Sequence, residues 1–234
     1  MATEIDSTRQ RILEAAGSVF AKKGFDGATV RDICQAAGAN VASVNYYFGD
    51  KHRLYVETVT WAHANRIAQV PIPKWPDGTP AEERLCDFIT VFLQRLFYSA
   101  EQPWHCELMM RELANPTEAC EQVVRSFIRD QFTLLQGILT ELVPSGLPEL
   151  KRHLITFGIV GQCLHYRIAE PVIRLLVPAE EFASYKVQLL AEHITDWTLA
   201  ALGRRPALHA SAATGRGIGQ TARVESTPAA PVRS

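Results

Sequence analysis

The chain has 234 residues, of which 47% are hydrophobic and 21% are charged, and its formal net charge is −1. These values are typical of a globular protein and exclude a uniformly basic nucleic-acid-binding chain, so any binding to DNA needs a local arrangement of residues. No apolar run approaches the ~18 residues of a membrane span, and the N-terminal residues lack the apolar core of a signal peptide, so we expect a cytoplasmic protein that binds no membrane.

The first predicted helix covers residues 9–23, where apolar side chains recur every third or fourth position on one face. Ser7, with a glutamine three residues later, has the spacing of a helix N-cap, and Gly24 follows two lysines at the expected end. The pattern therefore predicts an amphipathic helix that begins near Ser7 and stops at Gly24.

Two short helices and a tight turn follow. Thr29 with Asp32 three residues later predicts a capped start for a second helix, which ends at Gly38. Asn40 is a suitable N-cap for a third helix, and Asp50 is one for a fourth. About three residues, including a glycine, separate the second and third helices, which is the proportion of a helix-turn-helix.

The third predicted helix carries a run of aromatic residues. If Val41, Val44 and Phe48 face the small core, the small, polar and aromatic side chains between them face outward. Such a surface suits the major groove of DNA, where amides and hydroxyls bind base edges and basic or hydroxyl groups bind phosphates. The candidate DNA contacts are Thr29, Arg31, Ala42, Ser43, Asn45, Tyr46, Tyr47 and Lys51.

Spacing and charge leave a second interpretation of this region open. Helix-turn-helix shapes occur in proteins that bind no DNA, and exposed tyrosines also cover neighbouring helices. Residues 1–54 hold seven Lys or Arg against six Asp or Glu, which is a weak electrostatic footprint for DNA binding. From these residues alone, a DNA-binding head and a structural one are both consistent with the pattern.

The rest of the chain is also predicted to be helical, and no strand pattern competes. The turn-rich segment 70–80, VPIPKWPDGTP, is the main internal break. From residue 204 onwards, 19 of 31 residues are Ala, Ser, Gly, Thr or Pro, which predicts a disordered tail. The predicted helices after the break are 80–98, 104–114, 117–142, 148–176 with an interruption near Pro171, and 179–202.

Residues 12–54 strongly resemble the DNA-binding domain of TetR-family transcriptional regulators. The shared features include Phe20 with Gly24, the Ala-Gly before the turn, and the Tyr-Tyr-Phe run that precedes Gly-Asp-Lys. The form VNYYFG, rather than the commoner LYYHF, is similar to the CecR-type (YbiH-like) branch. The C-terminal half resembles the same branch at Arg111-Glu112, Pro116-Thr117 and the GQCL motif of residues 161–164.

This resemblance covers about residues 8–203 and implies an all-α protein. Its expected parts are a three-helix helix-turn-helix DNA-binding domain over residues 1–54, a larger helical ligand-binding and dimerisation domain over 55–203, and the tail over 204–234. In the family, the last two helices pack against their mates in a four-helix bundle, which implies a homodimer on an inverted-repeat, double-stranded DNA operator.

A stripe on the last predicted helix permits that interface, although packing within one subunit would produce the same pattern. The stripe consists of Phe182, Tyr185, Leu189, His193 and Trp197.

The resemblance also implies a cavity for a small-molecule effector in the C-terminal domain. Polar side chains mixed with aromatic residues and methionine on apolar helices are suited to a ligand site. Each has an alternative role, because such aromatic residues mostly belong to the core and Arg111-Glu112 also fits a structural ion pair. The candidate ligand-binding residues are Trp104, His105, Glu107, Met110, Arg111, Phe132, Gln136, His165 and Tyr166.

No motif of an enzyme is present, since the chain lacks G-x-S-x-G, a P-loop and H-E-x-x-H. The five cysteines are scattered without a C-x-x-C pair, which argues against disulfides and a metal site. His105 beside Cys106 lacks a third orienting group for nucleophilic catalysis. We therefore expect no catalytic residue, cofactor or metal, and a repressor that an inducer releases from DNA. The alternative is a helical small-molecule-binding or interaction protein without sequence-specific DNA binding.

Overall fold

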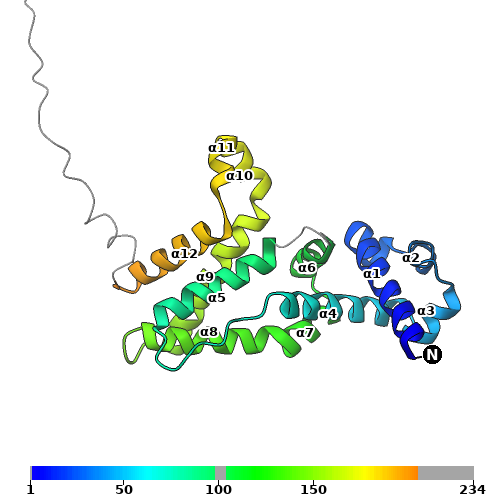
Figure 1. The fold of residues 1–234 in the computed structure, drawn as a ribbon, viewed down its shortest axis with the longest axis horizontal. Coiled ribbons are helices and arrows are strands. Elements are labelled where there is room, and N and C mark those ends of the chain that lie inside the picture. Colours follow the sequence, from blue (N-terminus) through cyan, green and yellow to red (C-terminus); the bar gives the residue numbers. More distant parts are fainter. Residues whose placement is uncertain (1, 98–103, 205–234) are drawn as a thin grey trace, which may run out of the picture.

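The computed structural model describes residues 2–97 and 104–204, and every regular element in these ranges is a helix. The first four helices are α1 (Ala2–Gly27), α2 (Val30–Ala37), α3 (Val41–Phe48) and α4 (Lys51–Gln69). Figure 1 shows that α1, α2 and α3 form one end of an elongated arrangement and that α4 runs from there towards the other helices. The prediction of an all-α fold is confirmed. Within the described ranges, no helix is long and apolar enough to cross a membrane.

Three side-chain caps fix the starts of α2, α3 and α4. The Thr29 hydroxyl accepts a hydrogen bond from the Asp32 N–H, and the Asp32 carboxylate accepts one from the Thr29 N–H, each at 3.1 Å. The side-chain oxygens of Asn40 and Asp50 accept hydrogen bonds from the third N–H of α3 and α4, at 2.7 and 2.8 Å. Gly38 ends α2 with φ of 60°, a conformation that glycine adopts without strain. The three predicted N-caps and the predicted end of α2 at Gly38 are confirmed.

The start of α1 differs from the prediction. The helix already begins at Ala2, so Ser7 lies inside it and is not its N-cap. The reason is that residues 2–7 contain neither glycine nor proline, and nothing in them interrupts the helix. At the other end, Gly24 has a non-helical backbone with φ of 73°, so the regular geometry stops where predicted.

The remaining helices are α5 (Ala81–Phe97), α6 (Trp104–Ala114), α7 (Glu118–Val123), a π-helical segment (Val124–Ile128), α8 (Arg129–Leu142), α9 (Glu149–Ile168), α10 (Glu170–Leu176), α11 (Ala179–Ser184) and α12 (Val187–Ala201). The break at 70–80 and the interruption near Pro171 are confirmed. The α7 N-cap is Thr117, whose hydroxyl accepts from the Ala119 N–H at 3.1 Å.

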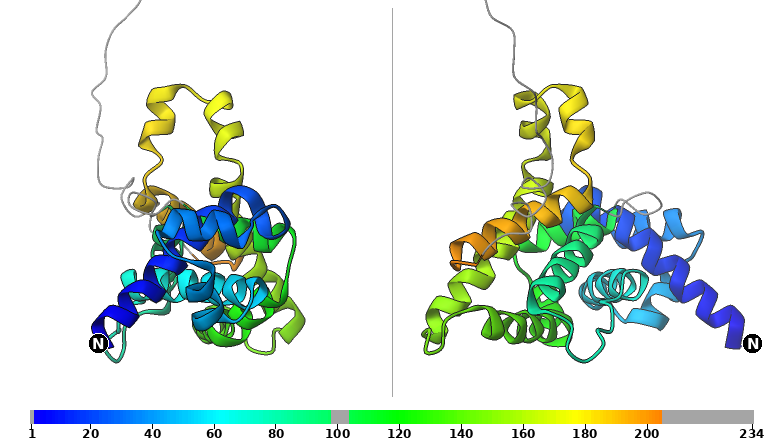
Figure 2. Two further views of the ribbon diagram at one scale, coloured as in Figure 1. Left: turned by 90° about the vertical axis from the view of Figure 1, so that its right-hand side faces the viewer. Right: turned by 60° about the vertical axis from the view of Figure 1, so that its left-hand side comes forward.

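The single helix predicted over 179–202 is wrong. Tyr185 leaves the helical conformation with ψ of 69°, and Lys186 is extended, so α11 and α12 are separate helices. The turn allows α12 to pack along α5 while α11 stays with α10. In both views of Figure 2, the α10–α11 hairpin projects away from the other helices.

The predicted tail begins one residue too early. Arg204 is ordered because its guanidinium donates hydrogen bonds to the Leu142 carbonyl at 2.9 Å and to Glu82 at 2.7 Å. The other residues of the predicted tail, 205–234, lie outside the described residues.

Two separate hydrophobic cores organise the described helices. The first, which we call the head core, includes Ile12, Leu13, Phe20, Ile33, Val44, Phe48, Leu54, Val59, Trp104, Leu108, Ala119 and Val123. The second, the body core, includes Leu85, Phe88, Ile89, Leu93, Leu135, Ile138, Leu139, Ile159, Leu190 and Ile194. Helices α6 and α7 therefore contribute to the head core, although the chain reaches them only after α5 has entered the body core.

Candidate nucleic-acid interface and small-molecule cavity

The outward face of α3 is small, polar and aromatic. Ala42, Asn45 and Tyr46 are exposed, and Tyr46 reaches 78% exposure, while Ser43 is partly exposed. These four side chains lie on the surface of a helix that is fixed from beneath by the head core. Hydroxyl and amide groups are able to form hydrogen bonds with base edges in the major groove.

Val41 departs from the predicted arrangement. Val44 and Phe48 are buried as expected, but Val41 is 45% exposed, so the prediction that it faces the core is wrong. The reason is its position in the first turn of α3, where no other helix covers this side. Val41 thus adds an apolar group to the exposed face, and apolar side chains can contact thymine methyl groups.

Two other predicted DNA contacts are partly engaged in the fold. Tyr47 is half-buried and packs against the head core. The Lys51 amine lies 4.5 Å from the centre of the Phe25 ring, an arrangement that favours the cation. Thr29 and Arg31 are exposed at the start of α2, and the Thr29 hydroxyl already caps that helix.

An ion pair connects α2 to α1. Lys23 Nζ lies 2.9 Å from the Asp32 carboxylate. The hydrogen bond from Lys23, together with those from Thr29, lowers the pKa of Asp32 to about 2. Asp32 therefore stays ionised to a lower pH than an ordinary aspartate.

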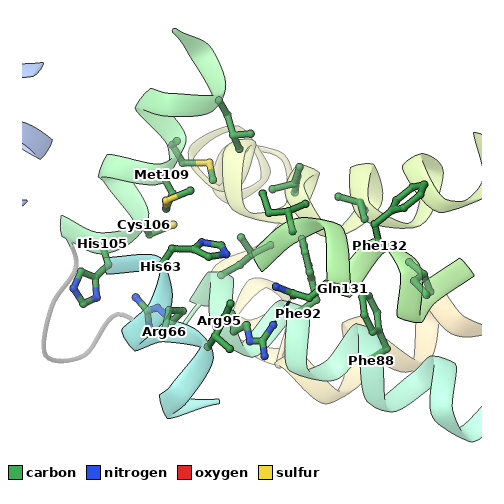
Figure 3. A pocket seen from close by; sticks show the side chains of 18 of the residues that line it. His63, Arg66, Phe88, Phe92, Arg95, His105, Cys106, Met109, Gln131 and Phe132 are labelled. Carbon is green, nitrogen blue, oxygen red and sulfur yellow. Dashed lines mark hydrogen bonds between the residues drawn. The ribbon is translucent and has the colours of Figure 1, made fainter. Parts of the chain in front are cut away.

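A cavity of about 300 Å³ lies between α4, α5, α6, the π-helical segment, α8 and α9. Most of its lining is aromatic and aliphatic (Figure 3). Its volume is at the lower end of the range for small-molecule sites in proteins. The lining residues are Ala62, His63, Arg66, Ile67, Phe88, Phe92, Arg95, Leu96, His105, Cys106, Met109, Met110, Leu113, Ile128, Gln131, Phe132, Leu135, Thr156, Phe157, Val160 and Leu164.

The few polar groups of the cavity are basic or neutral. Burial, with a contribution from nearby Arg95, lowers the pKa of His63 to about 4. Burial, with a contribution from Arg66, lowers the pKa of His105 to about 4 as well. Both imidazoles are therefore neutral at pH ~7. Among the described residues, neither Nε2 atom has a hydrogen-bond partner.

Three of the nine predicted ligand-binding residues line this cavity: His105, Met110 and Phe132. Glu107 and His165 are exposed on the outer sides of α6 and α9, and Tyr166 packs against the body core.

Three further candidates hold helices together. Trp104 lies against α1, where a Cβ on Gly17 would come within 2.0 Å of its ring. Arg111 donates hydrogen bonds to two α1 carbonyls, those of Ala21 at 2.6 Å and Lys22 at 3.1 Å. The third, the side-chain amide of Gln136, donates to the Thr156 hydroxyl on α9. The separation of these three from the cavity follows from helix rotation, because residues one or two positions apart face different sides.

The Arg111-Glu112 pair does not form the ion pair that the sequence also allowed. Glu112 is 1% exposed and accepts hydrogen bonds from the Tyr55 hydroxyl and from the N–H and hydroxyl of Thr117. It thereby joins α4, α6 and the start of α7 inside the head.

Sequence reasoning missed the cavity residues of α4 and α5. His63 and Arg66 lie three positions apart on one face of α4, and Arg95 interrupts the apolar face of α5. A basic residue on an otherwise apolar helix face is the signal that could have identified them. Among the described residues, no cluster of His, Cys, Asp or Glu could hold a metal ion.

Two family models together cover most of the chain. Residues 12–58 match the model of bacterial regulatory proteins of the tetR family, and residues 81–202 match that of the C-terminal domain of the HTH-type transcriptional dual regulator CecR. CecR of Shigella flexneri is 23% identical over 200 residues, which cover 81% of this chain and 89% of that protein.

Solved structures agree with the fold. A TetR-like transcriptional regulator from Rhodococcus sp. RHA1 superposes with a TM-score of 0.60 at 18% identity, covering 84% of this chain and 96% of that one. The regulator FadR from Bacillus subtilis, solved in complex with stearoyl-CoA, has a TM-score of 0.59 at 19% identity, covering 82% and 97%. The chain therefore belongs to the TetR family of transcriptional regulators, in the branch that shares the CecR-type C-terminal domain.

Proposed function

We propose that this regulator is a repressor that binds an inverted-repeat DNA operator as a homodimer and releases it when a small molecule occupies the cavity. The observation that carries the proposal is the position of α6 between the cavity and the head. The relatives are transcriptional regulators, which are not enzymes, and this agrees with the absence of a catalytic motif.

The two sides of α6 support a direct coupling between ligand and head. His105, Cys106 and Met109 line the cavity on one side. On the other, Trp104 packs against Gly17 and Arg111 holds the carbonyl groups at the end of α1. A ligand that displaces α6 also shifts α1, because the two helices are packed against each other and packed interfaces do not deform continuously.

An exposed apolar stripe supports the dimer. On α9, Leu154 is 54% exposed, and on α12, Trp197 is 63% exposed. Several large apolar side chains exposed on two helices are typical of a surface that another molecule covers. A symmetric dimer would cover the same stripe on both copies. The stripe consists of Leu150, Leu154, Phe157, Gly161, His165 and Ile168 on α9, and of Leu189, His193 and Trp197 on α12.

This stripe differs in membership from the one predicted on the last helix. Phe182 and Tyr185 are half-buried in and beside α11, where the Arg174 guanidinium lies 4.0 Å from the Phe182 ring centre. The α10–α11 hairpin adds Leu175 and Leu176 to the exposed apolar surface, and Leu175 is 87% exposed.

The dimer is tested by Leu154→Glu combined with Trp197→Glu. Four charges placed in one symmetric interface have to be desolvated, so we expect a monomer in sedimentation-velocity experiments. Val41→Glu, a charge on an exposed valine outside the stripe, is the matched control and should remain dimeric. A double variant that sediments like the unmodified protein would rule out this interface.

DNA binding is tested by selecting random duplex DNA with the purified protein and then measuring affinity as a function of salt. We expect an enriched inverted repeat whose half-sites lie about 34 Å apart, or a multiple of that distance, and a steep salt dependence. If no sequence is enriched at any salt concentration, the protein would instead be a helical small-molecule-binding or interaction protein.

Variants of the head separate sequence recognition from phosphate binding. Asn45→Ala should relax the preference at one base pair by ~1–3 kcal/mol, because a base-edge hydrogen bond is lost. Arg31→Ala should weaken binding to all sequences alike and reduce the salt slope by about 1. Lys74→Ala, which removes an exposed lysine in the 70–80 segment, is the control and should change neither quantity.

A further inference from the structure

Arg95 is the feature of the cavity that points to the chemistry of its ligand. This half-buried guanidinium donates one hydrogen bond from Nε to the Val70 carbonyl at 2.9 Å and one from Nη1 to the Gln131 side-chain oxygen at 2.6 Å. Both acceptors are uncharged. They hold the guanidinium in a fixed orientation, and neither of them compensates its charge.

No carboxylate balances this charge within residues 2–97 and 104–204. The ion pairs there do not include Arg95, and no Asp or Glu is among the described residues that line the cavity. Burial lowers the pKa of Arg95, which reflects the cost of keeping a charge away from water. A buried charge of this kind is usually paired, so a partner is expected from beyond the described residues, and a bound anion is one that the cavity can admit.

His63 adds a second polar group at the same end of the cavity. In Figure 3, Arg95 and His63 lie towards one end of the drawn cavity, and Phe88 and Phe132 lie towards the other. The His63 Nε2 atom has no hydrogen-bond partner among the described residues. A neutral imidazole can donate a hydrogen bond from Nε2 to an anionic oxygen. The cavity thus has a polar end with donors and an apolar end lined by aromatic rings.

We propose that the cavity binds an apolar organic monocarboxylate, with the carboxylate on Arg95 and His63 and the hydrocarbon part among the phenylalanine side chains. The proposal rests on the proposed function only in treating this cavity as the effector site. The charge of Arg95 disfavours cationic ligands. Neutral ligands would leave the Arg95 charge without a counter-charge.

Direct binding is measured by isothermal titration calorimetry on the full chain in the absence of DNA. Two sets of probes are used, and within each set the compounds differ only in the polar group. The first set compares biphenyl-4-carboxylate with biphenyl-4-carboxamide, and the second compares decanoate with decan-1-ol and decylamine. A charge-assisted hydrogen bond is stronger than a neutral one, so each carboxylate should bind at least about tenfold more tightly than its matched compounds.

Substitutions at Arg95 test whether this preference comes from the proposed contact. Arg95→Gln should reduce carboxylate affinity to that of the carboxamide, and Arg95→Lys should restore part of the preference because it keeps the charge. Arg84→Gln, at an arginine of α5 that pairs with Glu141 outside the cavity, is the control and should bind like the unmodified protein. Circular dichroism of each variant checks that it is folded.

The outcomes separate this proposal from the repressor function. Equal or tighter binding of the carboxamide, alcohol or amine, or no binding of any probe, would overturn the carboxylate proposal while leaving operator binding intact. An unchanged carboxylate preference in Arg95→Gln would overturn the assigned contact. If carboxylates bind through Arg95 but do not release the selected operator, the ligand chemistry stands and the inducer mechanism fails.

Discussion

The head core and the cavity differ in how completely their buried polar groups are satisfied. In the head, the buried Glu112 carboxylate accepts hydrogen bonds from Tyr55 and Thr117. In the cavity, the Nε2 atoms of His63 and His105 have no partner among the described residues. Buried polar groups are normally paired, so these two imidazoles distinguish the cavity from the head.

The head core is also more closely packed than the cavity. Phe20 is fully enclosed and its ring packs edge-on against Tyr55, with centres 4.8 Å apart. Phe132 is half-buried and borders the cavity. The comparison suggests that the head moves as one unit and that adjustment to a ligand takes place around the cavity and is passed on through α6.

The largest expected effect tests this difference in packing. Phe20→Ala should lower the free energy of unfolding by ~3–5 kcal/mol, because it leaves a new void in a filled core. Phe132→Ala should cost clearly less, because its ring already borders open space. Urea denaturation followed by circular dichroism measures both. Equal losses for the two variants would contradict the distinction between a closed head and an open cavity.

The head was largely predictable because its signals are local. The capping side chains of Thr29, Asn40 and Asp50 act within three residues of their own positions, so sequence spacing is enough to place them. The exposure of Val41 was missed because it depends on which helices cover the first turn of α3, and that is a tertiary property.

The cavity was only partly predictable, for a physical reason. Its lining comes from α4, α5, α6, α8, α9 and the π-helical segment, and which face of each helix turns inward depends on packing between distant segments. Prediction from chemical character alone selected Trp104 and Arg111, but both side chains contact α1 instead. It missed Arg95, whose proposed role rests on its position in the cavity and its uncharged partners Val70 and Gln131 and not on its residue type.

A second, smaller effect is expected at the contact between the head and α6. Gly17→Ala would place a Cβ about where the Trp104 ring lies, 2.0 Å from its nearest atom, so the ring or α6 has to shift. Overpacking of this kind costs ~1–3 kcal/mol of stability. The shift should also change operator affinity in the absence of ligand, which fluorescence anisotropy with labelled operator DNA can measure.

Gly137→Ala provides the matched control for this substitution. Gly137 lies in α8, and a Cβ there meets nothing within 4 Å. Because alanine is a better helix former than glycine, this variant should be more stable by ~0.5–1 kcal/mol and should bind the operator unchanged. If both alanine variants behave alike, the Gly17–Trp104 contact does not couple α6 to the head.

The last expected effect is a change in how stability depends on pH, and it tests the histidines of the cavity. Burial and the neighbouring Arg95 lower the pKa of His63 to about 4, whereas an unfolded chain has a histidine pKa of ~6.5. Between these values the unfolded state binds the proton and the folded state does not. The free energy of unfolding should therefore fall as the pH is lowered from ~7 towards ~5.

The variant His63→Gln removes this titrating group and keeps a neutral polar side chain. Its loss of stability between pH ~7 and ~5 should be smaller than that of the unmodified protein, because one fewer buried histidine resists protonation. The other charged or titratable lining groups, Arg66, Arg95, His105 and Cys106, remain in place. Met109→Leu changes the same cavity without removing a titrating group and should keep the original pH slope. Identical slopes in urea denaturation for His63→Gln and the unmodified protein would mean that His63 is not held neutral in the fold. The polar end of the cavity would then already contain a partner for it.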